Sequence, residues 1–97
     1  MPYYVALINW TDNGVKAAHD TVNRYQKAQS AFESLGVRFQ QILWTMGQYD
    51  IVAIMEAPDQ KAVTTALLRL AREGNVRSET LPAFNEQEMQ GIVEQLR

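Results

Sequence analysis

Residues 42–59 read ILWTMGQYDIVAIMEAPD, two apolar runs separated by Gly47 and Gln48 and closed by Pro58 and an aspartate. Branched and aromatic side chains pack well on a pleated surface, and glycine is favoured in the tight turns that join neighbouring strands. Proline and aspartate together are typical of a strand end followed by a helix start. The stretch therefore predicts a central β-hairpin, and the rest of the chain is organised around it.

The turn of this hairpin determines which side chains share a face of the sheet. A two-residue turn at Gly47 and Gln48 predicts four cross-strand pairs. These are Met46 with Tyr49, Trp44 with Ile51, Ile42 with Ala53, and Gln40 with Met55. The opposite face would carry Phe39, Leu43, Val52 and Ile54. A four-residue loop would keep this alternation, whereas a three-residue loop would break it. Both faces of the hairpin are too apolar to be left in water.

The composition predicts one globular domain spanning residues 1–97. Hydrophobic residues make up 46% of the chain and charged residues 21%, which is typical of a folded protein of this length. No stretch reaches the roughly 18 consecutive apolar residues of a membrane span, so no membrane partner is expected. The start, MPYYVALINW, lacks the basic region of a secretory signal, which makes the cytoplasm the expected location.

Several classes of function are disfavoured by what the chain lacks. It contains no cysteine and a single histidine, His19, so we expect neither a metal site nor a cofactor. A lone histidine in a loop is more often solvated than a ligand. The net charge is −2 and the basic residues are dispersed, so nucleic acid is not an expected partner.

The segments on either side of the hairpin predict alternating strands and helices. Residues 3–10 are apolar at both parities, as in a strand covered on both faces, so we place this strand in the middle of the sheet. Residues 11–14 predict a turn, and residues 15–20 fit either a loop or a short helical turn. An apolar stripe at spacings of three and four predicts a helix over residues 22–35, with Asp20 or Thr21 as N-cap and Gly36 after its end.

The second half of the chain repeats the pattern and adds one element. Asp59 is a predicted N-cap for a helix that Gly74 closes. Pro82 marks residues 75–84 as an edge strand, because an edge can spare one amide donor. Asn85 and Glu88 have the spacing of a capping box and begin a last helix. Its apolar stripe consists of Met89, Ile92, Val93 and Leu96.

The order strand, helix, strand, strand, helix, strand predicts an α+β fold of the ferredoxin-like βαββαβ type with an added C-terminal helix. Both central helices would lie on one face of an antiparallel sheet. The other face would be left uncovered, although the hairpin and the first strand are apolar on both sides. Because large exposed apolar patches usually mark interfaces, we expect a homodimer whose two sheets form a shared α/β barrel.

Three blocks of sequence resemble the GYD domain family, and together they span nearly the whole chain. They are Asn-Trp-Thr at 9–11, the segment GQYDIVAIMEAPD at 47–59, and NVRSETL at 75–81. The resemblance implies a dimeric α+β barrel, similar to the stress-responsive A/B barrel, YCII-like, antibiotic-monooxygenase-like and muconolactone-isomerase-like families. It does not imply an activity.

Three residues are candidates for catalysis: Tyr49, Asp50 and Glu56. The phenol of Tyr49 would donate to a ligand oxygen and Asp50 would act as a base beside it; alternatively, Tyr49 packs on the hairpin and Asp50 ties down the turn, which we favour. Glu56, if buried, would be an acid or base unless Arg77 reached it. The alternative for Glu56 is an exposed strand end.

Four residues are candidates for ligand binding: Asn9, Trp10, Trp44 and Arg77. Aromatic walls with one amide are common around planar apolar ligands. The alternative, which we favour, is that Asn9, Trp10 and Trp44 pack in the core and in the dimer interface. One hypothesis is therefore a homodimeric small-molecule-binding barrel, extending to a cofactor-independent isomerase or oxygenase for an aromatic or carbonyl compound. The alternative is a non-catalytic homodimeric protein-interaction or regulatory module.

Overall fold

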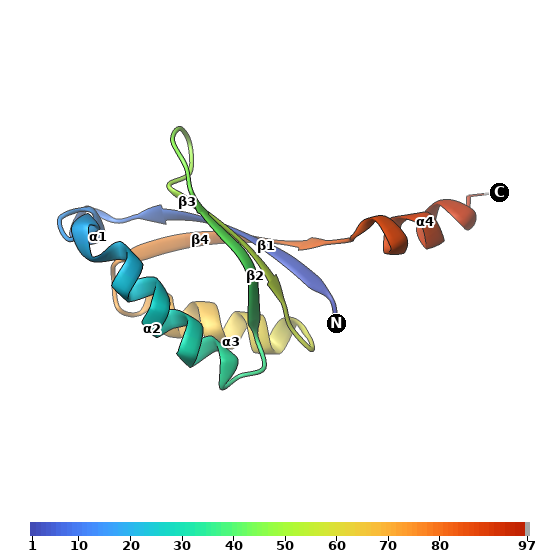
Figure 1. Ribbon diagram of the computed structural model, residues 1–97, viewed down its shortest axis with the longest axis horizontal. Helices are drawn as coiled ribbons and strands as arrows, with labels where there is room; N and C mark the ends of the chain where they lie inside the picture. The colour runs from blue at the N-terminus through green and yellow to red at the C-terminus, as the bar shows by residue number, and fades with distance from the viewer. Residues whose placement is uncertain (97) are drawn as a thin grey trace.

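The computed structural model describes residues 1–96. In chain order its elements are β1 (Tyr3–Trp10), α1 (Asp12–Val15), a short 3-10 helix η1 (Ala18–Asp20), α2 (Thr21–Glu33), β2 (Arg38–Trp44), β3 (Ile51–Glu56), α3 (Gln60–Ala71), β4 (Val76–Ala83) and α4 (Glu86–Glu94). The strands form one antiparallel sheet in the order β2-β3-β1-β4, with α2 and α3 on one side (Figure 1). The predicted ferredoxin-like order with an added C-terminal helix is confirmed, as are the central position of β1 and the edge position of β4.

The core lies between the sheet and the two helices. Every second residue of β1 and β3 faces the helices and is buried, because side chains of a strand alternate between its faces. Phe32 of α2, with Val63 and Ala66 of α3, meets them from the helix side. The Asp59 carboxylate caps α3 by accepting a hydrogen bond of 2.9 Å from the Ala62 N–H, as the sequence predicts.

The hairpin register is as predicted near the turn but not at its far end. Trp44 lies opposite Ile51 and Ile42 opposite Ala53, but the partner of Met55 is Phe39 and not Gln40. A β-bulge at Gln40 inserts one extra residue, which reverses the alternation beyond it. The predicted Gln40–Met55 pair and the placement of Phe39 on the outer face are therefore wrong. Phe39 faces the helices, where a large aromatic side chain gains most from burial.

The loop of the hairpin spans residues 46–49, so the predicted two-residue turn is also wrong. The Thr45 N–H donates to the Asp50 carbonyl at 2.8 Å, which closes the ladder at this pair. The Asp50 N–H does not donate to the Thr45 carbonyl, because it donates to the Ile8 carbonyl of β1 at 2.9 Å. Gly47 has a φ of 111°, which a glycine adopts without strain. Met46, predicted to lie on a sheet face, is 98% exposed in this loop.

The chain after β1 forms two short helical turns. The sequence predicted a plain turn over residues 11–14, where α1 forms, and either a loop or a short helical turn over residues 15–20, where η1 lies. Thr11 is the N-cap of α1 and accepts a hydrogen bond from the Gly14 N–H at 3.0 Å. The same hydroxyl donates to the Gly74 carbonyl at 2.6 Å, and the Thr11 N–H donates to the Asn75 carbonyl at 3.1 Å. These bonds fix α1 to the residues just before β4.

The side of the sheet opposite α2 and α3 is not covered by any helix within residues 1–96 (Figure 1). We call this surface the open face. Register pairs place one row of side chains across it at Leu43, Val52 and Leu7, and a second row at Ile54, Val5 and Leu81. Leu43 is 49% exposed and Leu81 44% exposed. The open face is therefore apolar at its centre, as the sequence predicts.

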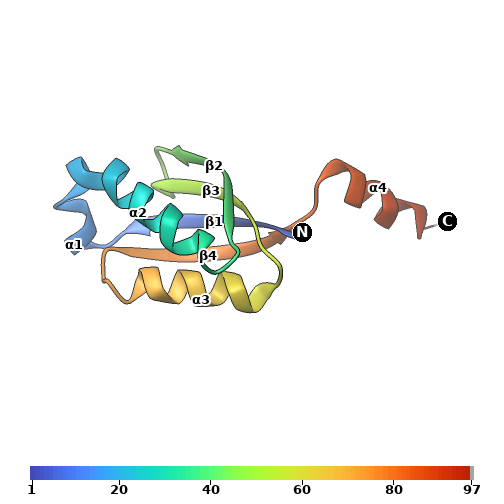
Figure 2. The ribbon, with the colours of Figure 1, turned by 60° about the horizontal axis from the view of Figure 1, so that its bottom comes forward.

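Helix α4 extends beyond the end of the sheet, away from α2 and α3, in both views (Figures 1 and 2). It begins with the predicted capping box, since Asn85 and Glu88 exchange side-chain to backbone hydrogen bonds. The described chain measures 52 × 31 × 18 Å, with a radius of gyration of 14.6 Å. A compact chain of this length has about 12–13 Å, and the projecting helix accounts for the difference. No helix within residues 1–96 is long and apolar enough to cross a membrane.

Candidate functional site

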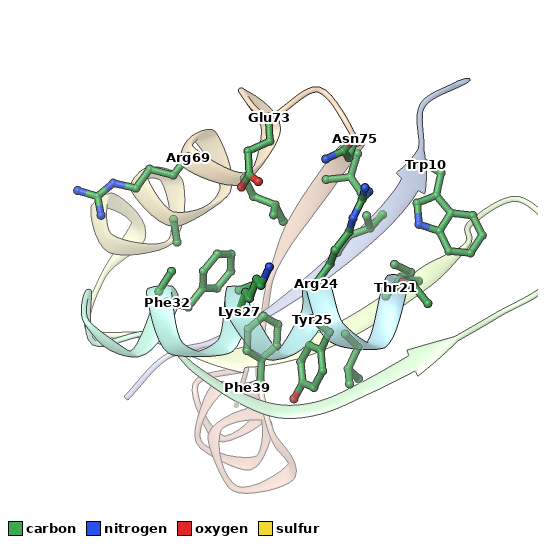
Figure 3. A pocket seen from close by; sticks show the side chains of 18 of the residues that line it. Trp10, Thr21, Arg24, Tyr25, Lys27, Phe32, Phe39, Arg69, Glu73 and Asn75 are labelled. Carbon is green, nitrogen blue, oxygen red and sulfur yellow. The ribbon is translucent and has the colours of Figure 1, made fainter. Parts of the chain in front are cut away.

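A cleft of about 510 Å³ opens between α2, α3 and the sheet (Figure 3). The two helices are far enough apart that the inner sheet face is reachable between them. The floor comes from the strands and includes Ile8, Ile42 and Ile51, while the walls come from α2 and α3. Its volume lies within the range of roughly 300–1,000 Å³ of pockets that hold small organic ligands.

Aromatic side chains form the wall of the cleft below α2. The rings of Tyr25 and Phe39 meet edge to face with centroids 5.3 Å apart, and Phe39 stacks on Phe32 at 5.1 Å. Tyr25 also meets Trp44 edge to face at 6.0 Å. The Trp44 Nε1–H donates to the Thr21 hydroxyl at 3.0 Å, which fixes the indole against the start of α2. The wall is therefore built from mutually oriented rings.

The rim of the cleft is charged. Arg24 and Lys27 project from α2 toward the side where Glu73 and Asn75 lie, and Arg69 lies on α3 (Figure 3). Arg24 is 3.7 Å from the Asp20 carboxylate, and within residues 1–96 this is the one ion pair. Lys27 and Arg69 are therefore free to meet an anion. The arrangement suits a molecule with an apolar body and a polar or anionic edge.

The structure separates the four predicted ligand-binding residues. Trp10 and Trp44 both line the cleft. Asn9 alternates with Trp10 on β1 and lies on the open face. Arg77 lines a second, shallower groove of about 430 Å³ between α3 and β4. Two of the four residues thus share one site, and their role in binding stays a prediction.

Tyr49 and Asp50 lie at the base of the hairpin loop, outside the lining of the cleft. The Asp50 carboxylate accepts a hydrogen bond of 3.0 Å from the Trp10 N–H, and so joins the loop to the end of β1. The Tyr49 carbonyl accepts a hydrogen bond of 2.6 Å from the Thr45 hydroxyl. These contacts give the two residues structural partners, and their catalytic role stays a prediction.

Glu56 lies at the other end of β3, half-buried on the open face. Six residues separate it from Asp50 along one extended chain, a distance of about 20 Å at roughly 3.3 Å per residue. Arg77 is equally far away, because it pairs with Asn9 whereas Glu56 pairs with Tyr3. Arg77 therefore does not reach Glu56. The three predicted catalytic side chains do not converge on one point.

The sequence did not identify the charged rim of the cleft. Arg24, Lys27 and Arg69 alternate with apolar residues along two helices and look like the solvated side of each helix. These three residues line one cleft only because α2 and α3 pack on the same face of the sheet. His19 is exposed in η1, and within residues 1–96 no three His, Asp or Glu side chains are grouped closely enough to hold a metal ion.

Comparison with known proteins supports one family. The GYD domain model matches residues 4–93. A protein of Thermus thermophilus named glutamine synthetase and cystathionine beta-lyase binding protein is 33% identical over 85 residues, which cover 87% of this chain and 90% of the relative. The crystal structure of TTHA0845 from Thermus thermophilus is similar with a TM-score of 0.55 and 26% identity, covering 88% of this chain and 95% of that one. With its fold, its sequence blocks and these matches, the chain belongs to the GYD domain family.

Proposed function

We propose that this chain is a cytoplasmic, homodimeric protein-interaction module that binds a metabolic enzyme and has no catalytic activity of its own. The observation that carries this proposal is the 33% identical relative, whose name describes binding to glutamine synthetase and cystathionine β-lyase. The similarity extends over nearly all of both chains, so the part of the relative that binds has its counterpart here. Enzymes of these two kinds are the expected partners.

The distribution of candidate catalytic residues supports an interaction role. A general acid and base that act on one substrate must lie within reach of the same molecule. Asp50 and Glu56 lie at opposite ends of β3, and the Asp50 carboxylate already accepts a backbone hydrogen bond. A module that only binds needs no such convergence.

The open face supports the homodimer. Each of its two central rows has three adjacent Leu, Val or Ile side chains and one polar end, Glu79 in the first row and Gln41 in the second. An apolar surface of this kind on a monomer favours association. A second copy placed face to face would bury both surfaces at once, as an isologous interface does, and would form the dimeric barrel. Leu43→Asp, at the β2 end of one row, where the side chain is 49% exposed, is expected to abolish the dimer, as measured by sedimentation velocity.

Binding is tested by isothermal titration calorimetry with purified glutamine synthetase and cystathionine β-lyase from the same organism. We expect a saturable heat with at least one of the two enzymes. Serum albumin serves as the control for non-specific association. Absence of heat with both enzymes would reject the proposal.

The hairpin loop offers a point for a sharper test. Met46 is 98% exposed in this loop, and methionine is frequent on surfaces that bind partners because its side chain is flexible and polarizable. Met46→Glu is expected to weaken enzyme binding on the order of tenfold, the effect of a central interface residue. Gln48→Glu places the same charge two residues away and is the matched control. Equal affinity of both variants and the wild type would place the binding surface elsewhere.

A second candidate function is supported by the cleft. Its volume and aromatic wall fit a small-molecule ligand, which would make the chain a binding barrel for an aromatic or carbonyl compound, extending to a cofactor-independent isomerase or oxygenase. Both tryptophans of the chain line the cleft, so intrinsic fluorescence reports specifically on its contents.

This candidate is tested with 1-anilinonaphthalene-8-sulfonate, an aromatic anion that matches the apolar wall and the rim cations Lys27 and Arg69. Binding in the cleft should quench tryptophan emission at one probe per chain. Ala28→Leu narrows the cleft and should reduce the quenching, while Gln26→Leu adds the same side chain to α2 outside the lining. Equal quenching in both variants would argue against a ligand in the cleft.

A further inference from the structure

Helix α4 is the element that the fold leaves without a partner. All of its residues are exposed, and none of its side chains belongs to the core cluster. We propose that α4 is an arm that packs on a second copy of this chain, where it extends the interface made by the open faces. This inference rests on the homodimer of the proposed function, but it makes a separate statement about the C-terminal segment.

The length of α4 requires a partner. The helix has nine residues, whereas isolated helices shorter than roughly 12–15 residues are marginal in water. The capping box contributes two hydrogen bonds, of 2.8 and 3.0 Å, which define where the helix begins. A cap alone does not stabilise so short a helix, because most helical stability in proteins comes from packing of an apolar face.

The apolar face that would pack is present and uncovered. Four side chains of the helix region form it at spacings of three and four, and Phe84 from the preceding linker adds to it. Their exposed fractions are 61% for Phe84, 47% for Met89, 39% for Ile92, 44% for Val93 and 80% for Leu96. Together they expose on the order of 500 Å², given that large apolar side chains carry roughly 150–250 Å² each.

A second copy is the occupant that fits these observations. The chain has another large uncovered apolar surface, the open face, and α4 leaves the sheet beside it, where Ala83 pairs with Tyr3. Both views show α4 directed away from its own sheet (Figures 1 and 2). Leu81 on the open face and Phe84 in the linker connect the two surfaces. A two-fold dimer would bury both arms reciprocally.

The area supports a single continuous interface. A stable interface buries about 800 Å² on each partner, and one arm supplies less than this. The open face adds further apolar surface, including Leu43 at 49% and Leu81 at 44% exposure. The opposite side of α4 carries Gln87, Gln90 and Glu94, which would remain in water.

A pair of matched variants tests the arm. Ile92→Glu places a charge in the apolar stripe, and Gln87→Glu places the same charge on the polar side of the same helix. Sedimentation equilibrium should show that Ile92→Glu raises the dimer dissociation constant on the order of tenfold or more, as for a buried interface residue, while Gln87→Glu stays within about twofold of wild type. A dimer unaffected by Ile92→Glu would overturn the inference and leave the homodimer intact.

A cross-linking experiment tests whether the contact is between chains. Met89 is replaced by the photoreactive residue p-benzoylphenylalanine, and dimers are assembled from equal amounts of isotopically heavy and light chains. We expect cross-linked peptides that join a heavy to a light chain. Products within one chain only would show that α4 folds back on its own subunit and would overturn the proposal. A wild type that is monomeric at all concentrations would reject the homodimer itself. A chain that still forms cross-links between copies through α4 but does not bind either enzyme would reject only the interaction function.

Discussion

Gly14 shows how one residue fixes the position of a distant segment. It is buried in α1, and a Cβ added there would overlap the carbonyl oxygen and carbon of Asn75. That carbonyl already accepts a hydrogen bond from the Thr11 N–H. The atoms that an added Cβ would meet are backbone atoms of Asn75, which cannot move aside without displacing the chain.

Gly14→Ala is therefore expected to lower the free energy of unfolding by about 2 kcal/mol or more, because overpacking against a fixed neighbour typically costs 1–3 kcal/mol. Gly91→Ala is the control, because a Cβ there has open space around it in the middle of α4. That change should stabilise the helix by about 0.5–1 kcal/mol. Urea denaturation measures both, and equal stability of the two variants would contradict the close approach of Gly14 to Asn75.

Asp50 permits a test of its structural role. Asp50→Ala removes the acceptor of the Trp10 N–H and should lower the free energy of unfolding by about 1–3 kcal/mol, the cost of losing a hydrogen bond to a charged group. Asp50→Asn keeps an acceptor oxygen and should lose less than half of that. Thermal denaturation of both variants at one protein concentration makes the comparison. If both melt like wild type, the hydrogen bond does not stabilise the hairpin base.

At the scale of elements, the sequence predicted the strands and helices well because each carried its own local pattern. The central strand was apolar at both parities, and Asp59 and Asn85 lay where helix caps belong. The bulge at Gln40 could not be predicted, because the residues around it fit an alternating strand with or without one extra residue. The loop length was missed because the N–H of Asp50 is taken by β1, a contact between segments far apart in sequence.

The bulge leads to a prediction about β2. Phe39 stacks on Phe32, so Phe39→Ala should lower the free energy of unfolding by about 2–4 kcal/mol, near the lower end for aromatic truncation because Phe39 is only partly buried. Leu43 lies between the bulge and the hairpin loop, with its side chain on the open face. The comparison variant is Leu43→Ala. Measured by chemical denaturation at concentrations where the chain is monomeric, it should cost less than about 1 kcal/mol. The reverse order of effects would contradict the register.

At the scale of the whole molecule, two of the four residues that the sequence suggested for ligand binding line the candidate cleft. Trp10 and Trp44 were identified because aromatic residues at strand ends are conspicuous in any sequence. The rim cations were not, because Lys27 and Arg69 belong to different helices and line one cleft only when α2 and α3 pack on the same face of the sheet. The open face was predicted because apolar residues at both parities require cover on both sides, and the fold supplies cover on one side only.

The central claim is that a dimer of this chain binds a metabolic enzyme, and native mass spectrometry tests it most directly. The chain is measured alone and then mixed with purified glutamine synthetase or cystathionine β-lyase from the same organism. We expect twice the chain mass for the protein alone, and for the mixture an enzyme assembly that has gained whole dimers. A monomer, or an enzyme assembly of unchanged mass with both partners at micromolar concentration, would contradict the account.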